Sequence, residues 1–101
     1  DKRTDYPGKK ISLTVQEKWN YNFSNEIGLV GGNEWQAGNL SYHLKSRPKW
    51  DNIFENDKNF MPKNTDDGFI LIGDTNILSE ICTGVFIEVE KQGICMIGKK
   101  K

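Results

Sequence analysis

Two short, uninterrupted apolar runs limit the folds open to this chain. They span residues 27–30 and 68–73. A strand that is half-exposed alternates apolar and polar side chains, whereas a strand covered on both faces is apolar throughout. The two runs therefore predict buried strands, and we expect them to form the parallel part of a sheet. Residues 49–54 are predicted as a third, short strand, and the polar residues 55–67 as a surface loop.

Helical periodicity appears before the first run and after the second. Within residues 9–23, apolar side chains recur at four-residue steps and form one stripe. These side chains are Ile11, Val15, Trp19 and Phe23. Pro7-Gly8 marks the start of this helix. Ser24-Asn25 ends it, because asparagine readily adopts the left-handed backbone conformation that closes a helix. A shorter helix over residues 76–82 follows a capping residue, which is either Asp74 or Thr75.

Another helix is predicted between the two apolar runs. Asn33 is a good N-cap for it, and Pro48 ends it by Ser46 because proline disfavours helical geometry in the residue before it. Gly38 in its interior costs about 1 kcal/mol relative to alanine. We expect such a glycine where another group approaches closely, either a neighbouring element or a ligand.

The last predicted elements form a hairpin. Strands over residues 85–90 and 94–97 flank a three-residue loop that ends in glycine, which is typical of a hairpin with a bulge. The order of elements predicts a small α/β sandwich with a mixed sheet and this antiparallel hairpin at one edge. At 101 residues, the chain is expected to form a single domain over 1–101.

The two cysteines are expected to be free thiols. If Glu90 pairs with Ile94 across the hairpin, Cys95 lies beside Val89. Cys82 then lies roughly 20 Å away, at about 3.3 Å per strand residue. A disulfide needs Cα atoms within about 7 Å of each other. Two buried thiols that act as small apolar residues are the prediction.

Charge and composition exclude several classes of function. The chain has 14 basic and 14 acidic residues, and this zero net charge argues against a nucleic-acid partner. It contains no run of roughly 20 apolar residues, which is the length that spans a membrane. His43 is the sole histidine, so a metal or catalytic role for it is disfavoured. We expect no metal and no cofactor.

Groups that stack and hydrogen-bond are concentrated in residues 31–48. They are Glu34, Trp35, Asn39, Tyr42, His43 and Arg47. Gly31-Gly32 precedes them, and these two glycines allow backbone or a ligand to approach closely. The sequence matches neither G-x-G-x-x-G nor the Walker pattern, which are the two glycine-rich motifs for binding phosphate. The segment is either a recognition site or a tight strand–helix connection with a hydrated helix face.

Two further groups of residues have competing explanations. Trp35, Tyr42 and Trp50 present aromatic faces that suit the C–H faces of sugars, but they also fit the core and its rim. Asp66 and Asp67, together with Asp74, flank a predicted strand where a cation would fit. Turn and capping roles explain these carboxylates more simply.

Several motifs along the chain resemble one known family. The motifs are Asp5-Tyr6-Pro7-Gly8-Lys9, the pattern W-x-A-G-N-L-x-Y at 35–42, and Arg47-Pro48. In this order they resemble the soluble C-terminal domain of bacterial membrane glycosyltransferases of family 39. These enzymes are similar to protein mannosyltransferases and to the aminoarabinose transferases of lipid A. The resemblance is strongest over residues 6–48 and weaker in 55–67.

The resemblance implies a parent with many membrane helices that takes sugar from a polyprenyl-phosphate donor. This domain would then lie on the periplasmic, extracytoplasmic side of the inner membrane. Its partners would be the membrane-embedded part of the same polypeptide and a lipid-linked sugar or glycan acceptor. In such enzymes the catalytic acid lies between early membrane helices, so no residue of this chain is assigned a catalytic role.

Five residues are predicted to form a recognition face. They are Glu34, Trp35, Asn39, Tyr42 and Arg47. The carboxylate and the amide would hydrogen-bond hydroxyls, an aromatic ring would stack, and the guanidinium would pair with an anion such as phosphate. The alternatives are a structural or protein-interaction domain with no ligand, and a carbohydrate-binding module. A free-standing small enzyme is disfavoured because the sequence offers no paired acid and base or activated nucleophile.

Overall fold

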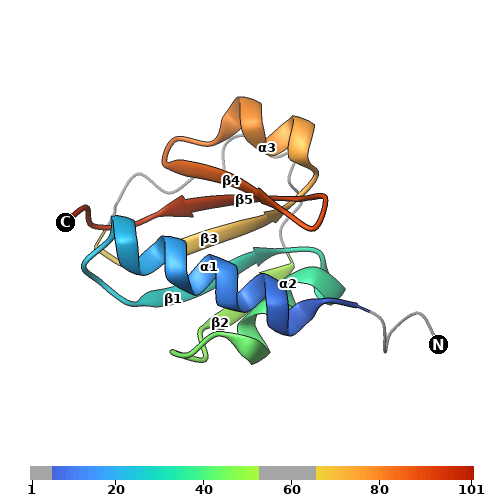
Figure 1. Ribbon diagram of the computed structural model, residues 1–101, viewed down its shortest axis with the longest axis horizontal. Helices are drawn as coiled ribbons and strands as arrows, with labels where there is room; N and C mark the ends of the chain where they lie inside the picture. Colours follow the sequence, from blue (N-terminus) through green and yellow to red (C-terminus); the bar gives the residue numbers. More distant parts are fainter. Residues whose placement is uncertain (1–5, 53–65) are drawn as a thin grey trace.

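The computed structural model describes residues 6–52 and 66–101, which form three helices and one five-stranded sheet (Figure 1). The elements in chain order are α1 (Gly8–Asn22), β1 (Ile27–Gly32), α2 (Glu34–His43), β2 (Lys49–Asn52), β3 (Gly68–Gly73), α3 (Thr75–Ile81), β4 (Val85–Val89) and β5 (Gln92–Ile97). The predicted α/β fold is confirmed. Most of the predicted loop over 55–67 lies outside the described residues.

The sheet is mixed and has the strand order β2-β1-β3-β5-β4. β1 pairs in parallel with β2 and with β3, which confirms the predicted parallel pair. β5 then pairs antiparallel with β3 and with β4, so the hairpin lies at one edge as predicted. β1 runs two residues further than its sequence predicted, through Gly31 and Gly32.

Alternate side chains of β3 face two separate apolar cores. Ile70 and Ile72 contact the stripe of α1 and the inner side of α2. Phe69 and Leu71 pack with Leu78 of α3 on the opposite face. The sheet is therefore covered by α1 and α2 on one face and by α3 on the other. All six residues of β3 are buried, as the continuous apolar run predicted.

Two of the three helices begin with the predicted capping bonds. The Asn33 side chain accepts a hydrogen bond from the backbone N–H of Gln36 at 2.8 Å, at the start of α2. Asp74 accepts one from the N–H of Ile77 at 3.0 Å, at the start of α3. These bonds satisfy backbone donors that have no partner inside the helix. They also give both polar residues a structural role.

The predicted helix ends need correction at two places. α1 ends at Asn22 in extended backbone, and the left-handed residue predicted at Asn25 does not occur. The Asn25 side chain instead accepts from the N–H of Lys99 and donates to the carbonyl of Asp66. α2 ends at His43, three residues earlier than predicted, because the chain enters a tight turn before Pro48.

The predicted register of the hairpin is wrong. Glu90 and Lys91 form a two-residue turn in which both residues have positive φ angles, 51° and 63°. Such a turn matches the twist of hairpin strands but usually contains glycine or asparagine. Cys95 is consequently paired with Phe86 rather than with Val89.

The new register brings the cysteines together, and the prediction of two free thiols is wrong. Cys82 and Cys95 form a disulfide with a Cα–Cα distance of 5.6 Å. Cys82 follows α3 directly, and α3 packs on the face of the sheet that Cys95 also faces. Cys82 does not lie beyond the end of the ladder as predicted, because α3 returns the chain over that face of the sheet.

No helix within residues 6–52 and 66–101 is both long and apolar enough to cross a membrane. The longest of them, α1, has 15 residues and is amphipathic, with one buried side and one exposed side. Its buried side supplies the stripe described above.

Reduction of the disulfide should lower the free energy of unfolding by about 3 kcal/mol, because it releases a loop with a sequence separation of 13. Urea unfolding with and without dithiothreitol measures this difference. The double variant Cys82→Ala/Cys95→Ala is the control, and its unfolding midpoint should not respond to the reductant. Equal midpoints for the oxidised and reduced native protein would contradict the prediction.

Candidate functional site

The glycine pair at the end of β1 allows one strand to approach another. Gly32 has a φ angle of 156°, and a Cβ added there would lie 2.6 Å from the backbone oxygen of Ile72 in β3. Such a distance is shorter than real Cβ contacts. Of the two partners that the sequence allowed for this close approach, backbone and ligand, the structure places backbone next to Gly32.

Three exposed aromatic rings lie together on α2 and β2. Trp35 and Tyr42 are 45% and 63% exposed and are seven residues apart, so they lie on one side of the helix. Trp50 of β2 is 43% exposed, and three adjacent atoms of its indole lie 3.6–3.9 Å from the position of a Cβ at Gly38. The missing side chain of Gly38 thus allows the indole to lie against α2 between the other two rings.

The turn between α2 and β2 adds a cation to these rings. The Arg47 guanidinium lies 4.8 Å from the centre of the Tyr42 ring, which is within the range of a cation–π contact. Arg47 has a φ angle of 49°, which is uncommon for a residue other than glycine. Two serine hydroxyls hold the turn: Ser46 donates to the carbonyl of Ile27 at 2.7 Å, and Ser41 donates to that of Pro48.

Most of the predicted recognition residues form one surface. We name it the α2–β2 face and define it by Glu34, Trp35, Tyr42, Arg47 and Trp50. Glu34 is exposed and lies one helical turn before Gly38, on the same row as Tyr42. The fifth predicted residue, Asn39, lies elsewhere.

Asn39 is turned toward α1. A side chain at Gly8 would overlap the Oδ1 atom of Asn39, so this oxygen packs directly against the glycine backbone. The oxygen is buried and accepts no hydrogen bond from the described residues. Asn39 therefore belongs to the contact between the two helices and not to the exposed face.

A chain of polar contacts borders the α2–β2 face where β5 begins. The Gln92 side-chain oxygen accepts hydrogen bonds from the Tyr6 hydroxyl at 3.0 Å and from the Gln36 amide at 2.9 Å. Tyr6 also contacts Trp35 edge to face, with 5.5 Å between ring centres. These contacts fix one side of the Trp35 ring, and the residue as a whole is 45% exposed.

Burial and ion pairing shift the pKa of two groups near this border. Burial raises the pKa of the Tyr6 phenol, and the hydrogen bond to Gln92 opposes this shift in part. The Lys10 ammonium nitrogen lies 2.7 Å from a carboxylate oxygen of Glu90. The hydrogen bond to this carboxylate and its negative charge raise the pKa of Lys10. Lys10 and Glu90 form the one ion pair found among the described residues, so Arg47 forms no ion pair with them.

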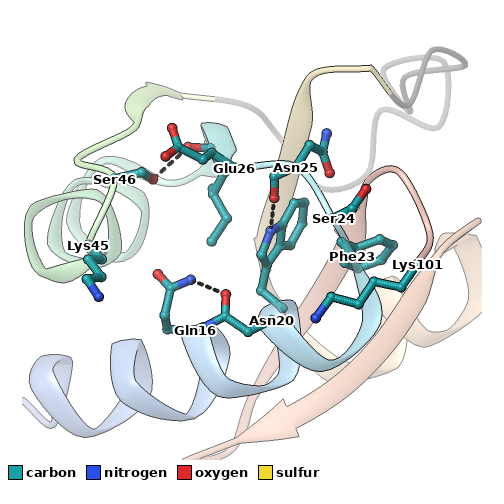
Figure 2. Close-up of a pocket in the computed structure, with 11 residues that line it drawn as sticks. Gln16, Asn20, Phe23, Ser24, Asn25, Glu26, Lys45, Ser46 and Lys101 are labelled. Carbon is teal, nitrogen blue, oxygen red and sulfur yellow. Dashed lines mark hydrogen bonds between the residues drawn. The ribbon is translucent and has the colours of Figure 1, made fainter.

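Sequence reasoning did not identify a hollow of about 440 Å³ on the other side of the α2–β2 turn (Figure 2). We name it the α1–turn hollow and define it by Gln16, Asn20, Glu26, Lys45 and Ser46. These residues come from α1, from the chain before β1 and from the turn after α2. The polar pair Gln16 and Asn20 beside the apolar stripe was the available signal.

Possible metal ligands do not gather anywhere in the described residues. Three or more histidine, cysteine, aspartate or glutamate side chains in suitable positions would define such a group. Asp74 caps α3, which confirms the capping role predicted for it as an alternative to cation binding. The described part of the chain thus offers aromatic, amide and cationic groups for binding.

Gly38→Ala should raise the free energy of unfolding by about 0.5–1 kcal/mol, because a Cβ there meets Trp50 at an ordinary contact distance and alanine favours helix. Gly32→Ala is the matched control. It should lower stability by more than about 1 kcal/mol because its Cβ would overlap the backbone of β3. Chemical denaturation measures both changes, and a destabilising Gly38→Ala would show that the helix does not tolerate a side chain beside Trp50.

Tyr6→Phe should reduce the fall in the free energy of unfolding that occurs at alkaline pH. Since the native pKa of Tyr6 is raised, the unfolded chain releases its phenol proton at a lower pH than the folded protein does. Stability therefore falls as pH rises above about 10. Urea unfolding between pH 8 and 11 measures this slope, and an unchanged slope in the variant would contradict the assignment to Tyr6.

Comparison with known proteins adds no relative. No protein-family model matches the chain, and neither a curated protein nor a solved structure matches it significantly. The resemblance to glycosyltransferases of family 39 therefore stays a prediction.

Proposed function

We propose that this chain is an extracytoplasmic accessory domain of a membrane glycosyltransferase that uses a polyprenyl-phosphate-linked sugar. In this proposal, the α2–β2 face binds the sugar and phosphate parts of the donor or an anionic glycan acceptor. The domain has no catalytic role of its own. It supplies binding or stabilises the membrane part.

One observation carries the proposal. The Arg47 guanidinium lies 4.8 Å from the Tyr42 ring, and Trp35 of the same helix and Trp50 of β2 are also exposed. Aromatic faces suit the apolar C–H surface of sugar rings, and guanidinium groups bind phosphate with two parallel hydrogen bonds. The face thus combines the two chemistries that a sugar phosphate requires.

The disulfide supports the proposed location. Disulfides persist in oxidising compartments such as the periplasm, and they are rare in the cytosol. Cys82 and Cys95 lie within bonding distance because of the hairpin register. The cysteine chemistry therefore agrees with the extracytoplasmic side that the sequence resemblance implies.

Titration of the ¹⁵N-labelled chain with mannotriose and with geranyl phosphate tests the proposal. Both probes should shift the indole N–H signals of Trp35 and Trp50, and the phosphate should also shift the guanidinium signal of Arg47. Loss of the charge in Arg47→Gln should weaken phosphate binding at least about tenfold, since hydrogen bonds to charged groups contribute about 1.5–3 kcal/mol.

Trp35→Ala should weaken mannotriose binding about fivefold, because one stacking contact is worth about 1 kcal/mol. Tyr21→Ala is the matched control, since Tyr21 is also exposed but lies on α1. It should bind both probes as the parent chain does. If neither probe shifts the face, or if all three variants behave alike, the domain is a structural one without a ligand.

A further inference from the structure

We propose that the α1–turn hollow is a second binding site, specific for a sugar acid. The ligand class is a small ring or chain that carries several hydroxyl groups and one carboxylate, as in a hexuronate. The volume of about 440 Å³ lies within the range of roughly 300–1,000 Å³ found for small-molecule sites. The polar groups on its walls define the chemistry of the ligand.

Three parts of the chain supply these walls (Figure 2). Gln16 and Asn20 project from α1, and Lys45 with Ser46 projects from the turn after α2. Glu26 precedes β1 on a further side of the hollow. Amide, hydroxyl, carboxylate and ammonium groups therefore surround one space.

A buried acceptor without a partner shows which kind of ligand the hollow requires. The Gln16 amide nitrogen donates to the side-chain oxygen of Asn20 at 3.0 Å. The Gln16 Oε1 atom is buried and accepts no hydrogen bond from the described residues. This atom is closed to solvent, so a ligand O–H reaches it only when the Gln16 side chain turns toward the hollow. A buried acceptor that stays unpaired is costly, so a ligand that turns Gln16 and donates an O–H bond to it is favoured. A plain anion such as acetate has no such donor at neutral pH.

The charged groups determine how the ligand is oriented. Lys45 provides an ammonium group and forms no ion pair with the described residues, so it is open to a ligand carboxylate. The Glu26 carboxylate repels an anion and accepts hydrogen bonds from hydroxyls. The ligand carboxylate therefore lies toward the turn, and its hydroxyls face Glu26 and Gln16. Lys101 adds a second cation at the rim.

The hollow and the α2–β2 face use different side chains. Ser46 lines the hollow and donates its hydroxyl to the carbonyl of Ile27, while the next residue, Arg47, contacts Tyr42 of the α2–β2 face. No residue that defines one site also defines the other. Failure of the proposed function is therefore distinguishable from failure of this inference.

Titration of the ¹⁵N-labelled chain with D-glucuronate, D-glucose and acetate tests the inference. Glucuronate should shift the side-chain amide signals of Gln16 and Asn20 to saturation, and these shifts should persist in the variants Trp35→Ala and Arg47→Gln of the α2–β2 face. Glucose and acetate each lack one of the two required groups, so each should bind at least about tenfold more weakly. Equal affinity for acetate or for glucose, or no shift with glucuronate, would overturn the inference.

Variants distinguish a specific site from general attraction. Lys45→Met should weaken glucuronate binding about tenfold and leave the weak glucose response unchanged. Gln16→Leu should weaken glucuronate and glucose alike, because it removes the acceptor for a hydroxyl. Lys18→Met is the control, since Lys18 projects from the opposite side of α1 and lines no part of the hollow. An equal loss in Lys18→Met would show that only net charge attracts the ligand and would overturn the inference.

Discussion

The structure depends on the burial of β3 on both of its faces. Ile70 and Ile72 contribute to the core beneath α1 and α2, and Phe69 and Leu71 contribute to the core beneath α3. Each such side chain gains about 1.5–3 kcal/mol from leaving water. Both edges of β3 are also paired, with β1 and with β5. β3 therefore joins the half of the domain that carries α2 to the half that carries the disulfide.

Elements set by local signals were predictable from the sequence. The apolar runs, the stripe of α1 and the caps at Asn33 and Asp74 each depend on a few adjacent residues. The hairpin register was not predictable in this way, because Glu90 and Lys91 adopt positive φ angles that neither residue type favours. The error of register then produced the error about the disulfide, because pairing across the hairpin decides how far Cys95 lies from Cys82.

The candidate sites show the same division. The segment after β1 contained most of the residues of the α2–β2 face, and the cost of Gly38 indicated that a neighbouring group packs there. That group is Trp50. The α1–turn hollow was not predictable, because Gln16, Glu26 and Lys45 are close only after the sheet has formed. Residues from three separate segments give no spacing that a sequence pattern can detect.

The strained backbone at Arg47 does not by itself indicate function. A residue other than glycine with a left-handed backbone costs about 1–3 kcal/mol. Hydrogen bonds from the hydroxyls of Ser41 and Ser46 and from the Arg47 N–H to the Leu44 carbonyl hold the turn, at about 0.5–1.5 kcal/mol each. These bonds offset the strain without a ligand. The turn bears on function through the groups that it places at the surface, which are the Arg47 guanidinium beside the exposed Tyr42 ring and the Lys45 ammonium, which forms no ion pair with the described residues.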